Sequence, residues 1–189
     1  MKKGWFEIPG VQQGDRTLAE QMLGVEPALA AAAGKTVCDL GCAEGLIALE
    51  FARAGAASVY GCDFNPPLVD EAIAQRDRAG LQKTVHFQVM NLNHLIASEY
   101  ASVEIWNYDI VLALAILHKL GDPHEALRFM AHATRERLVI RLPVGSTGVI
   151  YTKNKGVRCD VTQMLRSLSL RLELQVEGPR KELVQHWVR

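Results

Sequence analysis

The chain has 189 residues, of which 49% are hydrophobic, and its 21 basic residues balance its 21 acidic residues. This length is typical of one compact domain, and a formal net charge of zero gives no electrostatic bias toward nucleic acids or other polyanions. The longest apolar run, residues 110–117, is far shorter than the ~20 residues of a membrane-spanning helix, and the first residues do not resemble a signal peptide, so we expect a cytoplasmic protein.

The amino-terminal segment, residues 1–34, contains two short helical patterns, at 18–23 and 27–33. We expect it to form a helical cap, followed by a domain at residues 35–189. The two parts together are predicted to form a single domain overall.

From residue 36 onward, short apolar runs alternate with helical patterns. The runs that read as buried strands are 36–40, 58–63, 84–92, 108–118 and 137–142. This alternation predicts a parallel sheet with right-handed crossover connections. A long, partly basic connection at 143–158 and a short helix at 160–167 follow. Two further runs, 168–176 and 182–188, meet at a Gly178-Pro179 turn and predict an antiparallel closing hairpin.

A glycine loop follows the first apolar run. Asp39 stands near the end of that run, Gly41 and Gly45 frame the loop, and a helical pattern starts at once at 46–52. A second acid, Asp63, ends the next run. Acids at the carboxyl ends of neighbouring parallel strands lie where an open α/β sheet binds ligands, and a carboxylate can accept hydrogen bonds from both ribose hydroxyls. The sequence therefore predicts a nucleoside cofactor.

Asp39 also indicates which cofactor binds, because a carboxylate there would lie near the pyrophosphate of a dinucleotide. S-adenosylmethionine has no phosphate and carries two positive charges, so it suits an acid at this position. Asp39, Gly41 and Gly45 resemble the first motif of the class I methyltransferase superfamily, acid-x-G-x-G-x-G, with Ala43 in place of the middle glycine.

The resemblance extends along most of the chain. It implies an α/β fold, a Rossmann-like three-layer sandwich around a seven-stranded, mostly parallel sheet of order 3-2-1-4-5-7-6 with an antiparallel closing strand. It also implies S-adenosylmethionine as cofactor and S-adenosylhomocysteine as product.

The same resemblance assigns cofactor contacts. Asp63 would hold the ribose, and Phe64 would pack beside the adenine, with ordinary core packing as the alternative. Asn91 and Leu92 would meet the edge and face of the adenine, and Ala113 would offer its carbonyl oxygen to the methionine ammonium. The candidate residues in the glycine loop are Asp39, Gly41, Cys42, Ala43 and Gly45.

Arg16 is a further candidate, for the methionine carboxylate, with a solvated charge on a helix as its alternative role. Trp5 and Phe6 are apolar residues in the segment 4–16, which we predict to close over the cofactor and help form the acceptor pocket. The alternative is that these aromatic residues only cover the sheet or a subunit contact.

His118 is the candidate catalytic base. It follows the fourth run of the sheet, which the resemblance places near the transferred methyl group, and an ordinary histidine pKa of ~6.5 suits proton removal near neutrality. The alternative is a structural histidine at the end of the strand. No paired C-x-x-C spacing indicates zinc, so no metal is expected and the four cysteines are predicted to be buried, reduced thiols.

The sequence thus predicts an S-adenosylmethionine-dependent methyltransferase that acts on an unidentified acceptor, and a small molecule is the favoured acceptor class. An RNA or protein acceptor stays open, since residues 151–189 hold eight basic and four acidic residues. A non-catalytic regulatory or partner module that binds the cofactor is a second alternative, and a nicotinamide-dependent oxidoreductase is a disfavoured third. The acceptor atom and the oligomeric state are not predicted.

Overall fold

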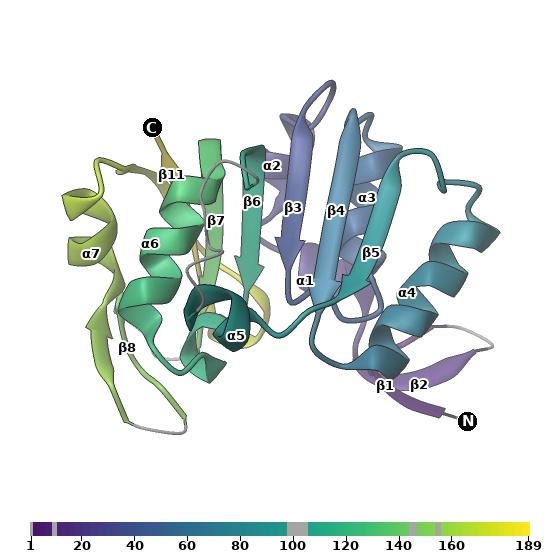
Figure 1. Cartoon of the computed structure of the whole chain (residues 1–189), viewed down its shortest axis with the longest axis horizontal. Helices are drawn as coiled ribbons and strands as arrows, with labels where there is room; N and C mark the ends of the chain where they lie inside the picture. The colour runs from purple at the N-terminus through teal and green to yellow at the C-terminus, as the bar shows by residue number, and fades with distance from the viewer. Residues whose placement is uncertain (1, 9–10, 98–105, 144–146, 154–155) are drawn as a thin grey trace. The chain divides into compact units, whose positions relative to one another are not determined.

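The computed structural model describes residues 2–8, 11–97, 106–143, 147–153 and 156–189 (Figure 1). The chain forms two compact units, residues 1–90 and 91–189. Among the described residues, no helix is both long and apolar enough to cross a membrane.

Seven strands form the main sheet. They are β3 (Thr36–Leu40), β4 (Ser58–Asp63), β5 (Val85–Val89), β6 (Tyr108–Leu114), β7 (Thr134–Leu142), β10 (Arg171–Glu177) and β11 (Leu183–Val188). Their order is β5-β4-β3-β6-β7-β11-β10, and β11 runs antiparallel to both β7 and β10. When the strands of this sheet are numbered in chain order, with β3 as strand 1 and β11 as strand 7, the order is the predicted 3-2-1-4-5-7-6. The expected fold class, with its antiparallel closing strand, is confirmed.

In the first unit, β3, β4 and β5 pair in parallel, as their short apolar runs predict. Helix α3 (Leu46–Arg53) packs against β3 and β4, and α4 (Pro66–Arg78) packs against β4 and β5. The buried face of α3 consists of Ile47, Ala48, Leu49, Phe51 and Ala52. Helix α4 begins with two prolines, whose missing N–H groups cost little in the first helical turn. These helices fix where the loops after β3 and β4 leave the sheet.

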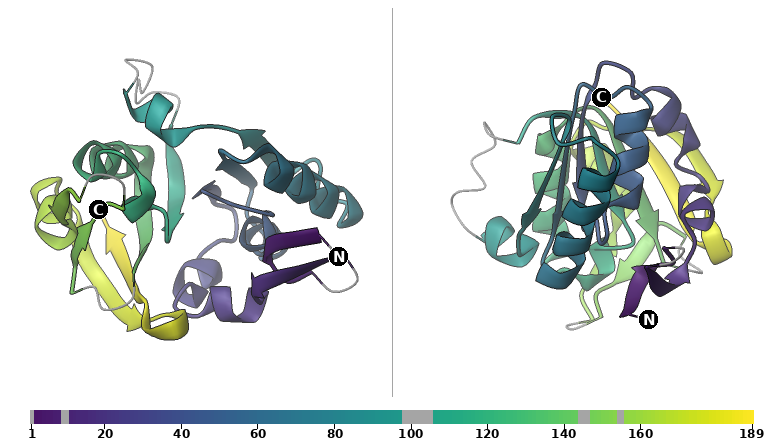
Figure 2. Two further views of the ribbon diagram at one scale, coloured as in Figure 1. Left: turned by 90° about the horizontal axis from the view of Figure 1, so that it is seen from below. Right: turned by 90° about the vertical axis from the view of Figure 1, so that its right-hand side faces the viewer.

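The amino-terminal segment contains more than the predicted helices. Helices α1 (Leu18–Met22) and α2 (Glu26–Ala30) confirm the two helical patterns. Before them, β1 (Lys2–Phe6) and β2 (Gln12–Arg16) pair in parallel, which the sequence analysis did not predict (Figure 2). The strand β2 is too polar for an apolar alternation to reveal it.

In the second unit, α6 (Pro123–Ala133) packs against β6 and β7. This unit also contains two short helices and a 3-10 turn: α5 (Leu92–Ala97), α7 (Val161–Ser167) and η1 (Leu117–Lys119). A second 3-10 turn, η2 (Pro179–Lys181), joins β10 to β11 near the predicted Gly178-Pro179 turn.

The predicted connection 143–158 is partly a hairpin. Strands β8 (Val149–Tyr151) and β9 (Arg158–Asp160) pair in antiparallel register. Residues 144–146 and 154–155 of the connection lie outside the described part. The hairpin escaped prediction because each strand has only three residues, too few for a periodic pattern.

All four cysteines are free and buried, which confirms the interpretation as reduced thiols. Burial is the main cause that raises the pKa of the Cys62 thiol to about 12 and that of the Cys159 thiol to about 11. The thiols are therefore protonated at neutral pH and are poor nucleophiles.

Gly45 is constrained by packing as well as by backbone conformation. Its φ is +73°, and a Cβ atom there would lie 2.4 Å from the Phe87 ring and 2.9 Å from the Ala72 Cβ. Gly80 has a similar φ of +69° with open space around it. We predict that Gly45→Ala lowers the free energy of unfolding by about 2–5 kcal/mol, and Gly80→Ala by only about 1–2 kcal/mol. Urea unfolding of both variants measures the difference, and equal losses would show that Phe87 does not constrain this position.

Candidate active site

The glycine loop between β3 and α3 has an unusual backbone. Gly41, Ala43 and Gly45 have φ values of +78°, +48° and +73°. The N–H groups of Gly41 and Cys42 donate to the Cys62 carbonyl at 2.8 and 2.9 Å, which ties the loop to the end of β4. Left-handed backbone costs an alanine roughly 1–2 kcal/mol, so Ala43 takes at some cost the conformation that the glycine of the resembling motif would take freely.

Asp63 connects the loop to the start of α4. Its Oδ2 accepts a hydrogen bond from the Ala43 N–H at 3.1 Å, and its Oδ1 accepts one from the Asn65 N–H at 3.0 Å. The side chain is nearly buried at the carboxyl end of β4. A carboxylate has about four acceptor sites, so two remain for the hydroxyls of a ribose. The acid is thus both oriented and able to accept further hydrogen bonds.

Phe64 follows Asp63 and has 71% of its surface exposed, the largest fraction among the exposed large hydrophobic residues described. The alternative of ordinary core packing is therefore wrong for this residue. An exposed ring beside an oriented carboxylate fits the base and ribose of a nucleoside. The other predicted acid, Asp39, is almost completely buried in β3, and Cys42 is buried in the loop.

Arg16 lies in β2 rather than in a helix, so its alternative role as a helix charge is wrong. Its guanidinium carbon lies 5.5 Å from the centre of the Trp5 ring. This contact orders two side chains of the β1–β2 pair. Its predicted role toward the methionine carboxylate stays a prediction.

Glu44, inside the glycine loop, was missed by the sequence analysis. Its side chain is completely buried and accepts hydrogen bonds from Trp5 N at 2.6 Å, Phe6 N at 3.3 Å and Gln12 Nε2 at 2.6 Å. The sequence pattern that could have drawn attention to it is a charged residue in a loop whose other residues are all small. Its partners lie more than 30 residues away and could not be deduced from that signal.

In the second unit, Asn91 and Leu92 lie at the start of α5. The Asn91 Oδ1 accepts a hydrogen bond from Asn93 N at 3.0 Å, and the Asn93 Oδ1 accepts one from Gly121 N at 2.7 Å. Leu92 is 7% exposed and Ala113, within β6, is completely buried. Their predicted cofactor contacts stay predictions.

His118 is held in a constrained turn after β6. Ala115 has a φ of +58°, which ends the strand and turns the chain toward η1. The His118 carbonyl accepts a hydrogen bond from Lys153 N at 2.8 Å, so the loop of the β8–β9 hairpin fixes the turn. Left-handed residues of this kind concentrate at functional sites.

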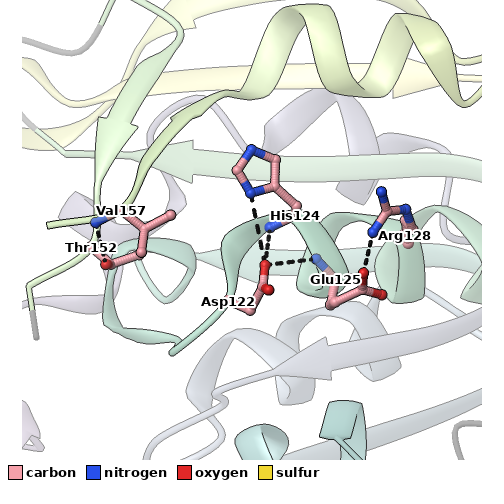
Figure 3. Close-up of polar contacts among 6 residues, drawn as sticks. All are labelled: Asp122, His124, Glu125, Arg128, Thr152 and Val157. Atoms are coloured by element: carbon pink, nitrogen blue, oxygen red, sulfur yellow. Dashed lines mark hydrogen bonds and ion pairs between the residues drawn. The ribbon is translucent and has the colours of Figure 1, made fainter. Parts of the chain in front are cut away.

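Figure 3 shows polar contacts at the start of α6 and within the β8–β9 hairpin. The Thr152 Oγ1 accepts a hydrogen bond from Val157 N at 3.1 Å, which closes the hairpin loop. The Asp122 Oδ1 caps α6 by accepting from His124 N at 2.9 Å and Glu125 N at 3.1 Å. These contacts order the hairpin loop and the start of α6.

The environment of His118 differs from the sequence-based expectation. Its side chain is 8% exposed, and burial, together with the charges of Lys119 and Lys153, lowers its pKa to about 4. The expected ordinary pKa near 6.5 was therefore wrong, because sequence spacing does not reveal desolvation. The imidazole Nδ1 is buried and has no hydrogen-bond partner among the described residues. His118 is consequently neutral at pH 7.

The described residues include no group of three or more His, Cys, Asp or Glu side chains that could hold a metal ion.

Comparison with known families identifies the chain. The sequence profile of the family described as "Methyltransferase domain" matches residues 31–169, which include the glycine loop, Asp63 and His118. The chain belongs to this S-adenosylmethionine-dependent methyltransferase family. The predicted family and cofactor are confirmed, and the oriented Asp63 carboxylate and exposed Phe64 ring fit a nucleoside cofactor.

Among curated proteins, the methyltransferase is similar to a ubiquinone biosynthesis O-methyltransferase of Psychrobacter cryohalolentis, with 30% identity over 91 residues. The match covers 48% of this chain and 33% of the relative, so it spans about a third of that protein.

Two solved structures share the fold. An S-adenosylmethionine-dependent methyltransferase from Aquifex aeolicus has a TM-score of 0.67 and 17% identity, covering 92% of this chain and 94% of that one. Magnesium protoporphyrin IX methyltransferase from Synechocystis PCC 6803, with bound S-adenosylmethionine, has a TM-score of 0.65 and 22% identity, covering 87% and 76%.

The lowered pKa of His118 predicts a pH dependence of stability. In the unfolded chain His118 has an ordinary pKa of ~6.5, whereas in the folded protein its pKa is about 4. Below pH ~6.5 the unfolded chain therefore binds the proton more tightly. The stability that is present above this pH is lost as the pH falls toward 4. We expect wild-type protein to lose about 1–3 kcal/mol more unfolding free energy than His118→Gln between pH 6.5 and 4. Urea unfolding at several pH values measures this, and parallel curves for the two proteins would contradict it.

Proposed function

We propose that this methyltransferase transfers a methyl group from S-adenosylmethionine to a hydroxyl group of a small molecule. The observation that carries the proposal is the family match across residues 31–169. The small-molecule acceptor is supported by the printed activity of the Psychrobacter relative, an O-methyltransferase of ubiquinone biosynthesis. A cytoplasmic location stays a prediction.

The first unit supplies the chemistry for holding a nucleoside. The Asp63 carboxylate, oriented by two backbone N–H groups, would accept the ribose hydroxyls, and the exposed Phe64 ring would cover one face of the adenine. The Asp63 carboxylate is already oriented by its two hydrogen bonds, which limits the conformational entropy lost on binding. The bound cofactor supplies an activated methyl group.

The second unit supplies a neutral proton acceptor. We propose that the neutral imidazole of His118 accepts a hydrogen bond from the acceptor hydroxyl. The hydroxyl proton would pass to the imidazole as the acceptor oxygen bonds to the methyl carbon, the methyl–sulfur bond of the cofactor breaks and S-adenosylhomocysteine leaves. With a pKa of about 4, this imidazolium would be a stronger acid than an ordinary one and would lose its proton readily near neutral pH.

This role predicts a pH profile as well as a rate loss. With a pKa of about 4, His118 contributes no inflection to turnover between pH 6 and 8. We expect His118→Ala to lower turnover by roughly 10²-fold with nearly unchanged cofactor affinity. Release of S-adenosylhomocysteine is measured with catechols, hydroxybenzoates and hydroxylated quinones, with transfer RNA and unfolded protein as competing acceptors.

The outcomes separate the alternatives. Methylation of a phenolic compound that depends on His118 supports the proposal. Methylation of RNA or protein alone would replace it, and S-adenosylhomocysteine binding without turnover on any acceptor would identify a non-catalytic module. Preference for NAD over S-adenosylmethionine would favour the oxidoreductase alternative.

Asp63 offers a direct test of cofactor binding. In Asp63→Asn an amide NH2 replaces one carboxylate oxygen and faces either a backbone N–H or a ribose hydroxyl. We expect a loss of about 1.5–3 kcal/mol in affinity for S-adenosylhomocysteine, the scale of hydrogen bonds to a charged group. Isothermal titration calorimetry measures it, with Asp70→Asn on the exposed side of α4 as control. A folded Asp63→Asn variant with wild-type affinity would refute the ribose role.

A further inference from the structure

Glu44 joins the glycine loop to the amino-terminal strand pair β1–β2. The three groups that donate to its carboxylate, Trp5 N, Phe6 N and Gln12 Nε2, all belong to that pair. Gln12 is 2% exposed, and its Nε2 also donates to the Phe6 carbonyl at 2.8 Å. A buried carboxylate without such donors would be strongly destabilising, so the pair and the loop depend on each other.

Two glycines of the strand pair make this contact sterically possible. A Cβ atom at Gly4 would lie 1.9 Å from Gln12 Nε2 and 2.3 Å from Glu44 Oε1. A Cβ atom at Gly14 would lie 2.0 Å from the carbonyl carbon of Phe6. The close approach of β1, β2 and the loop therefore requires these small residues, which marks a specific, built contact.

The contact acts at the strained part of the cofactor loop. Glu44 stands between Ala43 and Gly45, both in left-handed conformation, and the Ala43 N–H is a donor to Asp63. Strained backbone persists only where the surroundings determine it strongly. Asp63 holds the loop from the side of β4, and Glu44 holds it from the side of β1 and β2.

We propose that Glu44 is a positioning residue, which binds the β1–β2 pair to the glycine loop and thereby keeps the loop in its cofactor-binding conformation. We call its hydrogen bonds with Trp5 N, Phe6 N and Gln12 Nε2 the clasp. The inference rests on the proposed binding of S-adenosylmethionine by this loop. Because coupling between two sites is reciprocal, bound cofactor also stabilises the clasp.

Two variants break the clasp from opposite sides. Glu44→Gln presents an amide NH2 to a set of partners that are all donors. Gly4→Ala disturbs the same contact from β1 and changes no loop residue. Glu7→Gln, which alters an exposed glutamate in the neighbouring segment, makes the same charge change away from the clasp and serves as control.

We expect Glu44→Gln and Gly4→Ala each to weaken S-adenosylhomocysteine binding by roughly 5- to 30-fold, within the range of typical coupling between sites. Calorimetry measures the affinity, and NMR hydrogen exchange follows the Trp5 and Phe6 amides. Both variants should speed exchange of these amides, and saturating S-adenosylhomocysteine should slow it in the wild type. The double variant should bind S-adenosylhomocysteine no more weakly than whichever single variant has the lower affinity. The reason is that both substitutions break the same contact, so their effects do not add.

Wild-type affinity in both single variants despite fast amide exchange would overturn the positioning role, as would losses that add in the double variant. If Glu44→Gln does not fold, Gly4→Ala alone carries the same expectation. A wild-type protein that fails to bind S-adenosylhomocysteine would instead refute the proposed function, and the amide exchange would still test the clasp.

Discussion

The left-handed backbone of the glycine loop is the constraint on which the candidate cofactor site depends. A loop with positive φ at Gly41, Ala43 and Gly45 is unfavourable unless other groups hold it. Here two carboxylates do so: Asp63 accepts the Ala43 N–H, and Glu44 projects out of the loop to donors in another part of the unit. The site is therefore a network in which the loop, the end of β4 and the amino-terminal strands share their stability.

Ala43 shows how the chain manages a departure from the glycine-rich motif. An alanine in this conformation raises the free energy of the loop, and the Ala43 N–H offsets part of that cost by bonding a charged acceptor. Gly45 retains glycine for a further reason, because the Phe87 ring occupies the space that a Cβ would need. At position 43 only backbone conformation disfavours a side chain, and an alanine is tolerated. At position 45 backbone conformation and core packing both disfavour one.

The turn that carries His118 follows a different principle. Its backbone is fixed by a left-handed Ala115 and by the Lys153 N–H, while its imidazole is desolvated and lies near two lysine charges. Such an environment favours the neutral ring over the imidazolium. Only the neutral form of an imidazole can accept a proton, which is what the proposed role of His118 requires.

The amino-acid sequence by itself indicated the parallel sheet, the family and the cofactor, because buried strands, Asp39, Asp63 and the loop glycines are local patterns; the strand order followed from the resemblance to the methyltransferase superfamily. Only the tertiary structure revealed the clasp at Glu44 and the low pKa of His118, since both arise when residues distant in the sequence meet and exclude water. The strands β1, β2, β8 and β9 also became visible only in the structure, because they are short or polar and pairing with a nearby segment rather than periodicity defines them.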